Sequence, residues 1–288
     1  MPDQFAPTLI AVDIGNSRIK LGKFDRGTLT PPGALLEPSD TIDLPIDFRT
    51  GQFDENRLTA WTAKNAGENC LWLIASVHHA ATGQFTSRIT YLTAQQTSNW
   101  RIRRLTFMDI PMHIRVDEPA RVGIDRLLAS FAANRLRRPD RGAIVVDLGS
   151  AITVDQVDAE GGFAGGAILP GITLSARALA EQTDALPRVE MHELGRPPAP
   201  LGKSTVSAIE SGLYWGAVGA IRELMRRLAL NQETPPDVFV AGGASSLVAG
   251  LLAQSGTTDD ESKRIAVRHV PHLVLSGIAL VDSAIPEP

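Results

Sequence analysis

Two stretches of the sequence share one pattern, an acid-x-Gly-polar turn between two strand-like segments. They read AVDIGNSRIKLGKFD over residues 11–25 and VVDLGSAITVDQVD over residues 145–158. A continuous apolar run precedes each turn, and apolar residues alternate with polar ones after it, which is typical of a buried strand followed by a half-buried strand. One such turn could be an ordinary hairpin, because Asp, Asn and Gly favour turns. Two of them, one in each half of the chain, predict an internally duplicated α/β fold.

The length of the chain suits such a duplication. The sequence has 288 residues, of which 43% are hydrophobic and 21% are charged, a composition typical of globular proteins with room for two cores. The stretch LRRPDRG, residues 136–142, separates the two copies. We therefore expect an N-terminal domain over residues 1–138 and a C-terminal domain over residues 139–288.

Charge and cysteine content argue against several classes of protein. The formal net charge of −4 predicts no general attraction to nucleic acid or to a membrane surface. Arg101, Arg103 and Arg104 form a short basic cluster, which we interpret as a solvated strand edge or the rim of an anion site. Cys70 is the single cysteine, so no intramolecular disulfide can form, and its apolar neighbours predict an inert buried thiol.

Targeting and membrane signals are absent from the sequence pattern. The N-terminus has no basic segment followed by an apolar core, as a secretory signal would. No segment approaches the roughly 20 apolar residues that span a bilayer. We therefore expect a cytoplasmic protein that binds neither nucleic acid nor a membrane.

Hydrophobic periodicity predicts most of the remaining elements. Expected helices cover residues 53–67, 122–138, from Pro170 or Gly171 to Pro187, and 205–230, and expected strands cover residues 71–77, 142–147 and 237–243. In the second of these helices the apolar residues follow the i, i+3, i+4, i+7 spacing of an amphipathic helix. The Pro-, Gly- and Asp-rich segment over residues 26–50 predicts turns and short edge elements.

The turn at residues 13–17 has the composition of a phosphate-binding device. Gly15 would allow a backbone conformation closed to other residues and a close approach by an anion, while Asn16 and Ser17 add side-chain donors. Asp13, at the end of a buried strand, could hold a hydrated Mg²⁺ ion that bridges phosphates, and Lys20 could add positive charge. Taken alone, the stretch could equally be an ordinary hairpin turn.

A second phosphate-like motif fails on its composition. LGKST, residues 201–205, resembles the end of a Walker A loop, but Pro197 stands where that motif requires a glycine. Proline lacks an N–H group and restricts the backbone, so this stretch cannot cradle a phosphate in that manner. We reject the Walker A interpretation.

The second turn strengthens the first. Asp147, Gly149 and Ser150 repeat the pattern, and two such turns facing one another would clamp a polyphosphate. With these turns the sequence resembles the actin-like ATPase and sugar-kinase superfamily, in which two ribonuclease-H-like domains each present an acid-x-Gly hairpin to ATP. VFVAGGASSL, in which an apolar strand runs into Gly242 and Gly243, looks like the adenosine motif of that superfamily.

Three further motifs resemble those of one family, the type III pantothenate kinases. They are a Gly-x-Asp-Arg signature at the start of a helix, a Gly-Gly-x-x-x-Pro-Gly stretch, and a Gly-x-Ser-Thr segment. The matching residues are Gly123, Asp125 and Arg126, then Gly165, Gly166, Pro170 and Gly171, and finally Gly202, Ser204 and Thr205. The order and spacing agree from about residue 9 to about residue 280.

The resemblance implies an ATP-dependent phosphorylation of pantothenate to 4'-phosphopantothenate, the first step of coenzyme A biosynthesis. It makes Asp125 the general base and Asp147 a ligand of a monovalent cation, K⁺ or NH₄⁺. Thr205 would reach the pantothenate held by a neighbouring subunit, which implies a homodimer. The expected nucleotide-binding residues are Asp13, Gly15, Asn16, Ser17, Arg18, Ile19, Lys20, Ser150, Gly242 and Gly243, and the expected substrate-binding residues are Gly123, Ile124, Asp125, Arg126 and Thr205.

Simpler roles remain open for several of these residues. Asp125 could cap the helix that follows it, Arg126 could be a surface arginine, and Thr205 could cap the long helix after it. Val116 stands about where many family members have a pocket tyrosine, and Ser17 and Ser150 stand where Thr is usual. Two rival functions follow, a kinase of another small alcohol and a regulatory relative without catalysis, although the latter would be expected to lose the catalytic acids.

Overall fold

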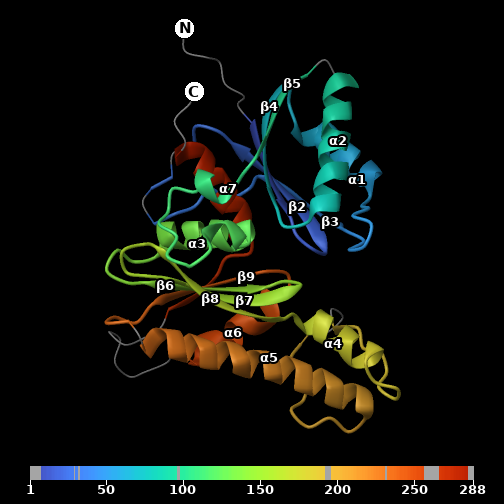
Figure 1. The fold of residues 1–288 in the computed structure, drawn as a ribbon, viewed down its shortest axis with the longest axis vertical. Coiled ribbons are helices and arrows are strands. Elements are labelled where there is room, and N and C mark those ends of the chain that lie inside the picture. Colours follow the sequence, from blue (N-terminus) through green and yellow to red (C-terminus); the bar gives the residue numbers. More distant parts are fainter. Residues whose placement is uncertain are drawn as a thin grey trace. The chain divides into compact units, whose positions relative to one another are not determined.

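The computed structural model describes residues 8–28, 30–31, 33–95, 98–191, 196–230, 232–255 and 266–284. Over these residues the chain forms two compact α/β units, each built on a five-stranded mixed sheet (Figure 1). Unit 1 holds the described residues up to Met112, the segment Asp117–Leu136 and the residues from His272 onward. Unit 2 holds His113–Val116 and Arg137–Pro271.

The sheet of unit 1 has the strand order β3-β2-β1-β4-β5. Its strands are β1 (Thr8–Ile14), β2 (Arg18–Asp25), β3 (Asp40–Pro45), β4 (Asn69–Ser76) and β5 (Asn99–Arg104). The first three pair antiparallel, and β4 and β5 add in parallel. Helices α1 (Glu55–Asn65), α2 (His79–Gln95), α3 (Ile124–Leu136) and α7 (Leu273–Ala284) belong to the same unit, with short 3-10 turns at Phe107–Asp109 and Pro119–Arg121.

The two faces of this sheet carry different residues because side chains alternate along each strand. Ile10, Val12 and Ile14 of β1 lie in one apolar cluster with buried residues of α1 and α2. The intervening positions, among them Asp13, point to the opposite face, where α7 and α3 pack. Every residue of β1 is buried, as its continuous apolar sequence predicted.

Helix α7 crosses α3 at a glycine. A Cβ atom added at Gly277 would stand 2.3 Å from the carbonyl oxygen of Leu128, so only glycine permits this approach. The helix is also held by Ser276, whose hydroxyl donates to the carbonyl of Leu36 at 2.9 Å, and by the ion pair of Asp282 with Arg26 at 2.7 Å. Its first nine residues, Leu273–Val281, are all buried, which accounts for their nearly unbroken apolar sequence.

Unit 2 repeats the plan of unit 1. Its strands are β6 (Ala143–Leu148), β7 (Ala151–Val157), β8 (Phe163–Pro170), β9 (Asp237–Ala241) and β10 (Val267–His269), in the order β10-β9-β6-β7-β8. The pairing of β6 with β7 and β7 with β8 is antiparallel, and the pairing of β6 with β9 and β9 with β10 is parallel. Helices α4 (Ile172–Glu181), α5 (Thr205–Leu230) and α6 (Ser245–Ser255) complete the unit. The equivalent strand orders confirm the expected duplicated α/β architecture.

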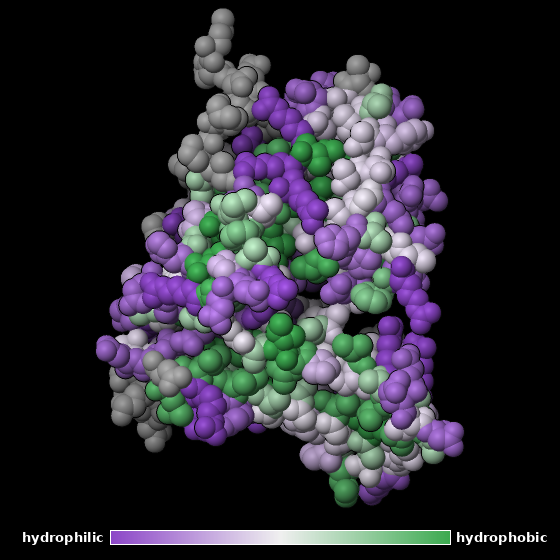
Figure 2. Space-filling view, viewed as in Figure 1, coloured by the Kyte–Doolittle hydropathy of each residue, from purple (hydrophilic) through white to green (hydrophobic). Residues whose placement is uncertain are grey.

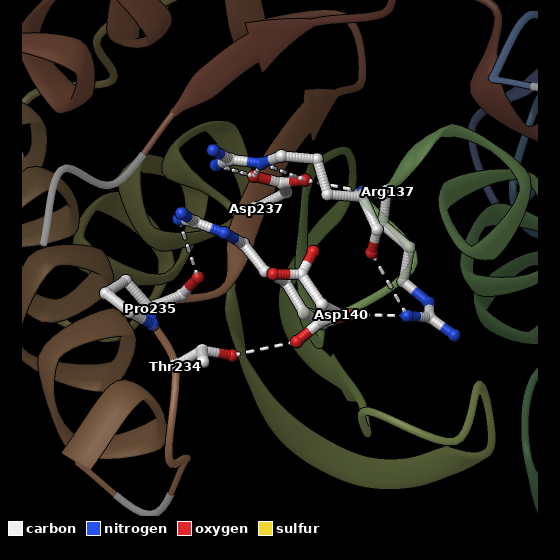
Figure 3. A network of polar contacts seen from close by, with 7 residues as sticks. Arg137, Asp140, Thr234, Pro235 and Asp237 are labelled. Carbon is white, nitrogen blue, oxygen red and sulfur yellow. Dashed lines mark hydrogen bonds and ion pairs between the residues drawn. The ribbon is translucent and has the colours of Figure 1, made fainter. Parts of the chain in front are cut away.

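A polar network fixes the start of unit 2 (Figure 3). The guanidinium of Arg138 pairs with the carboxylate of Asp237, which is 4% exposed, and the Arg138 N–H donates to the same carboxylate at 2.9 Å. The hydroxyl of Thr234 donates to the carbonyl of Asp140 at 3.0 Å. These contacts fasten the loop before β6 to the residues that begin β9.

The division of the chain differs from the expected one at its C-terminal end. The chain enters unit 2 after Leu136, close to the expected boundary at residues 138 and 139, but α7 returns to unit 1. The nine buried residues at the start of α7 must be covered, and in unit 1 α3 and the sheet provide that cover.

The surface of the described residues is mixed. On the face shown in Figure 2, hydrophilic side chains alternate with smaller hydrophobic groups. Among the described residues, five exposed large apolar side chains belong to unit 2 on or between β8, α4 and α5: Ile168, Leu174, Leu201, Val206 and Leu230. In the described part of the chain, no helix has the length and apolar character needed to cross a membrane.

Replacing Gly277 with alanine should destabilise unit 1. The added methyl group cannot fit against the Leu128 backbone without separating α3 from α7, and overpacking of this kind costs about 1–3 kcal/mol. Urea unfolding followed by circular dichroism measures the loss. Gly216→Ala is the matched control, because Gly216 lies in α5 with open space at its Cβ position. That control should be neutral or stabilising by up to about 1 kcal/mol, and an equal response of the two variants would contradict the packing argument.

Candidate active site

The turn between β1 and β2 presents three side chains to solvent. The Gly15 N–H donates to the carbonyl of Arg18 at 3.0 Å and closes the turn. Asn16, Ser17 and Arg18 are exposed, whereas Ile19 returns to the buried core. The turn is held from outside by the Ile46 N–H, which donates to the Ser17 carbonyl at 2.9 Å. The turn thus places amide, hydroxyl and guanidinium groups at the end of β1, and the Arg18 guanidinium pairs with the Asp43 carboxylate at 3.0 Å.

One of the two expected reasons for glycine at position 15, a backbone conformation closed to other residues, is wrong. Gly15 is not among the described glycines with positive φ, and a Cβ atom added there would meet nothing closer than the Arg18 carbonyl oxygen at 3.4 Å, an ordinary contact. Gly149, in the corresponding turn of unit 2, also lacks a positive φ. What glycine provides at both turns is therefore space beside the backbone, into which a ligand can approach.

Asp13 and Lys20 lie side by side on one face of the sheet. They are directly opposed in the antiparallel pairing of β1 with β2, and directly opposed residues project to the same face. Asp13 is 8% exposed, so its carboxylate lies largely out of water. A buried carboxylate needs a cationic or hydrogen-bonding partner. The register places a lysine opposite it and an exposed polar turn two residues beyond.

Asp125 is the second residue of α3. Its Oδ1 accepts the N–H of Arg126 at 2.8 Å and lies so close to Gly123 that a Cβ atom added there would stand 2.6 Å away. Burial raises the pKa of the Asp125 carboxyl above its ordinary value, and the Arg126 N–H and guanidinium and the more distant Lys20 only partly oppose this. A carboxyl group in this state is a stronger proton acceptor than an exposed one.

The geometry does not support a capping role for Asp125. A capping side chain accepts from an N–H two or three residues ahead, whereas Asp125 accepts from its direct neighbour. The residue that precedes the helix is Gly123, whose carbonyl accepts the Leu127 N–H at 3.3 Å. Ile124 is buried, and Arg126 is half-buried rather than a free surface arginine.

In unit 2 the equivalent turn is shorter. Asp147 lies next to the end of β6, and Gly149 and Ser150 connect it to β7, with the Gly149 N–H donating to the Ala151 carbonyl at 3.0 Å. Gly171, directly before α4, packs against this turn: a Cβ atom added there would stand 2.4 Å from the Ser150 carbonyl oxygen. The last glycine of the Gly-Gly-x-x-x-Pro-Gly stretch, Gly171, therefore packs directly against the backbone of this turn.

Gly242, the residue after β9, packs closely against the Asp147 side chain. Its φ of +94° is accessible mainly to glycine, and a Cβ atom added there would stand 2.5 Å from Asp147 Oδ1. The loop is tied to β6 by the Ala244 N–H, which donates to the Leu148 carbonyl at 3.3 Å. Gly243 differs, because it is exposed and has open space at its Cβ position. The Gly-Gly pair therefore combines a packing glycine with an open one.

The remaining motifs take simpler positions. Val116 lies beside Gly165, whose φ is +100°, because residues 113–116 pair with Phe163 at the start of β8. Ser204 caps α5 by accepting the Ser207 N–H at 3.2 Å, so Thr205 is left as an exposed first residue of the helix rather than its cap. Gly202 packs against the first turn of the same helix, which is not the geometry of a Walker A loop.

Two other candidates for chemistry can be set aside. The Cys70 thiol is fully buried, and burial raises its pKa to about 12, so it is inert as expected. Arg101 and Arg104 are exposed on β5, an edge strand of the sheet.

Among the described residues no group of three His, Cys, Asp or Glu side chains could hold a metal ion by itself. Asp13 nevertheless fits a hydrated Mg²⁺ ion, which takes one or two carboxylates and phosphate oxygens.

Comparison with known proteins gives a consistent result. A family model described as type III pantothenate kinase matches residues 9–227. A type III pantothenate kinase from Anaeromyxobacter sp. (strain K) is 32% identical over 282 residues, which cover 95% of this chain and 98% of the relative. One from Saccharopolyspora erythraea is 31% identical over 295 residues, covering 95% and 97%.

Solved structures agree at the level of the fold. A Sinorhizobium meliloti protein provisionally named 2-dehydro-3-deoxygalactonokinase superposes with a TM-score of 0.53 at 12% sequence identity, covering 96% of this chain and 98% of its own. Such a distant likeness shows the fold alone. It agrees with the expected α/β fold of two mixed sheets flanked by helices.

The pKa shift of Asp125 predicts a pH-dependent gain in stability for Asp125→Asn. Because the folded pKa lies above the ordinary 3.8, the wild type loses stability as pH rises through that folded pKa, where a desolvated carboxyl must ionise. Asparagine carries no charge at any pH. The variant should therefore unfold at a higher temperature than the wild type at neutral pH, and the gain should vanish toward pH 4 and below, where the wild-type carboxyl is protonated. A constant difference across the pH range in calorimetry would contradict the assignment.

Proposed function

The chain belongs to the type III pantothenate kinase family, and we propose that it transfers the terminal phosphate of ATP to the primary hydroxyl of pantothenate. The products are 4'-phosphopantothenate and ADP, and the reaction is the first step of coenzyme A biosynthesis. The observation that carries the proposal is the state of Asp125, a desolvated carboxyl at the start of α3, within electrostatic reach of Lys20. Lys20 in turn lies opposite Asp13 beside the exposed turn.

Asp125 acts as the general base in this proposal. As the pantothenate hydroxyl oxygen bonds to the γ-phosphorus, the bond to the β-phosphate oxygen breaks, and the hydroxyl proton moves to the Asp125 carboxylate. The raised pKa favours that transfer because it brings the affinity of the carboxylate for a proton closer to what the reaction requires. Oδ1 is held by the Arg126 N–H, which fixes the direction of the carboxylate.

Unit 1 also holds groups suited to a triphosphate. The donors of Asn16, Ser17 and Arg18 and the backbone of residues 15–20 bind phosphate oxygens, and Lys20 adds positive charge. A Mg²⁺ ion bound with ATP would neutralise charge on the phosphates, and Asp13 would hold it through its water shell. The open space at Gly15 admits the phosphate chain beside the backbone.

Unit 2 holds its own set of candidate nucleotide-binding groups. We assign Ser150 to phosphate binding and Gly242 with Gly243 to the adenosine end of ATP. Asp147, whose carboxylate lies against Gly242 at the end of β6, is assigned to a monovalent cation, K⁺ or NH₄⁺. Such a cation would add positive charge near the phosphates without taking part in bond making.

We assign pantothenate binding to the residues at the start of α3. The guanidinium of Arg126 suits the carboxylate of pantothenate, and Gly123 and Ile124 line the same position. Val116, which lies beside Gly165, has a smaller and less polar side chain than the tyrosine that the resemblance would place there. That single observation favours the alternative proposal, a kinase of another small alcohol, while the presence of both Asp13 and Asp125 argues against a regulatory relative without catalysis.

We further propose that the enzyme is a cytoplasmic homodimer in which Thr205 contacts pantothenate bound to the partner subunit. Thr205 is exposed at the start of α5 and is not needed as the helix cap, since Ser204 has that role. Leu201 and Val206, four residues before it and one after it, are 75% and 41% exposed, so two apolar side chains close to Thr205 in the sequence face water. A second copy of the chain would cover them.

The proposed reaction is tested by coupled measurement of ADP release with ATP, Mg²⁺ and pantothenate, with and without K⁺. The wild type should release ADP only when pantothenate is present, and faster with K⁺. Asp125→Asn should lower kcat by about 10²–10⁴-fold, because general base catalysis is lost, while the affinity for ATP changes little. Asp184→Asn, an exposed carboxylate after α4, is the matched control and should match the wild type. Pantothenate-dependent turnover that survives in Asp125→Asn would exclude Asp125 as the base.

Subunit sharing is tested by complementation. Thr205→Ala should raise the KM for pantothenate by about threefold to tenfold, the effect of one lost hydrogen bond. When Thr205→Ala and Asp125→Asn proteins are unfolded and refolded together, mixed dimers should regain one complete site with the wild-type KM. Refolding each variant alone is the control. If the mixture shows only the activity of its Thr205→Ala component, Thr205 acts within its own subunit or not at all.

A further inference from the structure

A serine behind the Gly242–Gly243 loop makes two short contacts that the motifs above do not explain. Ser245 is the first residue of α6 and is 2% exposed. Its Oγ lies 2.6 Å from the carbonyl oxygen of Gly242 and 2.7 Å from Nε2 of His269. His269 belongs to β10, the edge strand of unit 2 that pairs with β9. The three residues join the loop, the helix and the edge strand of the sheet.

The donor and the acceptor in each of these two hydrogen bonds follow from the atoms involved. A carbonyl oxygen carries no hydrogen, so the single hydroxyl proton of Ser245 must lie toward Gly242 to make the 2.6 Å contact. The Ser245 oxygen is then free only to accept. His269 must therefore donate, which means that Nε2 carries a hydrogen whether the imidazole is neutral or charged. The order of donation is His269 to Ser245 to Gly242.

This order fixes the direction of one peptide group. The Gly242 carbonyl accepts from both the hydroxyl and the N–H of Ser245, the latter at 3.2 Å, and so points toward α6. In a trans peptide the N–H of the next residue points the opposite way. The Gly243 N–H is therefore turned away from α6, and Gly243 is the exposed glycine with open space at its Cβ position. The contacts hold a backbone donor in a constant direction on the open side of the loop.

We propose that Ser245 and His269 are positioning residues for ATP. They orient the Gly242–Gly243 peptide so that the Gly243 N–H can donate to the nucleotide, and they do so without touching it. The inference rests on the proposed kinase function, because that function is what assigns this loop to ATP. Gly242 also packs on Asp147, so a loop that loses its orientation loses a wall of the nucleotide site.

Two other roles for the pair fit less well. A Ser–His pair can act as nucleophile and base, but here the hydroxyl proton is directed at a carbonyl and the serine is almost fully buried. A helix-capping serine precedes its helix and accepts an N–H from inside it, whereas Ser245 is the first helical residue and donates to a residue before the helix. Positioning of the loop explains both contacts.

The test is the kinetic effect of removing each donor in the full-length enzyme. Ser245→Ala should raise the KM for ATP about fivefold, the size expected for one hydrogen bond, with kcat and the KM for pantothenate unchanged. His269→Leu should have a smaller effect in the same direction. His269→Gln should restore the wild-type KM, because the glutamine amide can donate from about the position of Nε2.

Ser276→Ala is the matched control, since Ser276 is a buried serine that also donates to a carbonyl, that of Leu36 in unit 1. It should lower thermal stability and leave the KM for ATP as it is. The proposal is overturned if Ser245→Ala leaves the affinity for ATP unchanged, or if His269→Leu and His269→Gln behave alike. Titration calorimetry with a non-hydrolysable ATP analogue measures the same differences directly, so the inference can be judged even if pantothenate proves not to be the substrate.

Discussion

The pairing register of β1 with β2 is the constraint on which the chemistry of unit 1 depends. It sets Asp13 opposite Lys20 and, because side chains alternate, directs both to the face that α3 and α7 cover. A slip of one residue would reverse the faces of one strand relative to the other and turn one of the two charges into the apolar cluster. The short turn closed by Gly15 and Arg18 prevents that slip, so the same residues that bind phosphate in our proposal also fix the sheet.

The placement of Asp125 depends on how α3 packs on that same face of the unit 1 sheet. Its carboxylate folds back against Gly123 and the Arg126 N–H, in an environment that raises its pKa, and α3 is held in place by the close crossing with α7 at Gly277. The C-terminal helix thus supports the proposed base although it lies at the far end of the sequence. Burial of the ionised Asp125 carboxylate lowers the stability of the fold and raises the pKa of the group. The raised pKa is the physical basis of its proposed role as a proton acceptor.

Much of this arrangement could be predicted from the sequence, because its signals are local. The paired hairpins, the buried strands and the helix over residues 205–230 all follow from hydrophobic periodicity, and α5 occupies that range. The return of α7 to unit 1 could not be predicted, since a largely apolar sequence indicates that a helix is buried but not which unit buries it. The contact of Ser245 with His269 joins residues in separate elements and leaves no local pattern. The special backbone conformation expected at Gly15 was wrong, because composition shows that glycine is present but not which φ it adopts.

The most direct test of the central claim is to identify the product. ³¹P NMR of a reaction containing ATP, Mg²⁺, K⁺ and pantothenate should show a new phosphomonoester signal, split by the two protons of the CH₂ group that bore the hydroxyl, growing in step with ADP. That result would establish phosphoryl transfer to the primary alcohol of pantothenate. ADP accompanied only by inorganic phosphate, or a nucleotide that remains intact, would contradict the account.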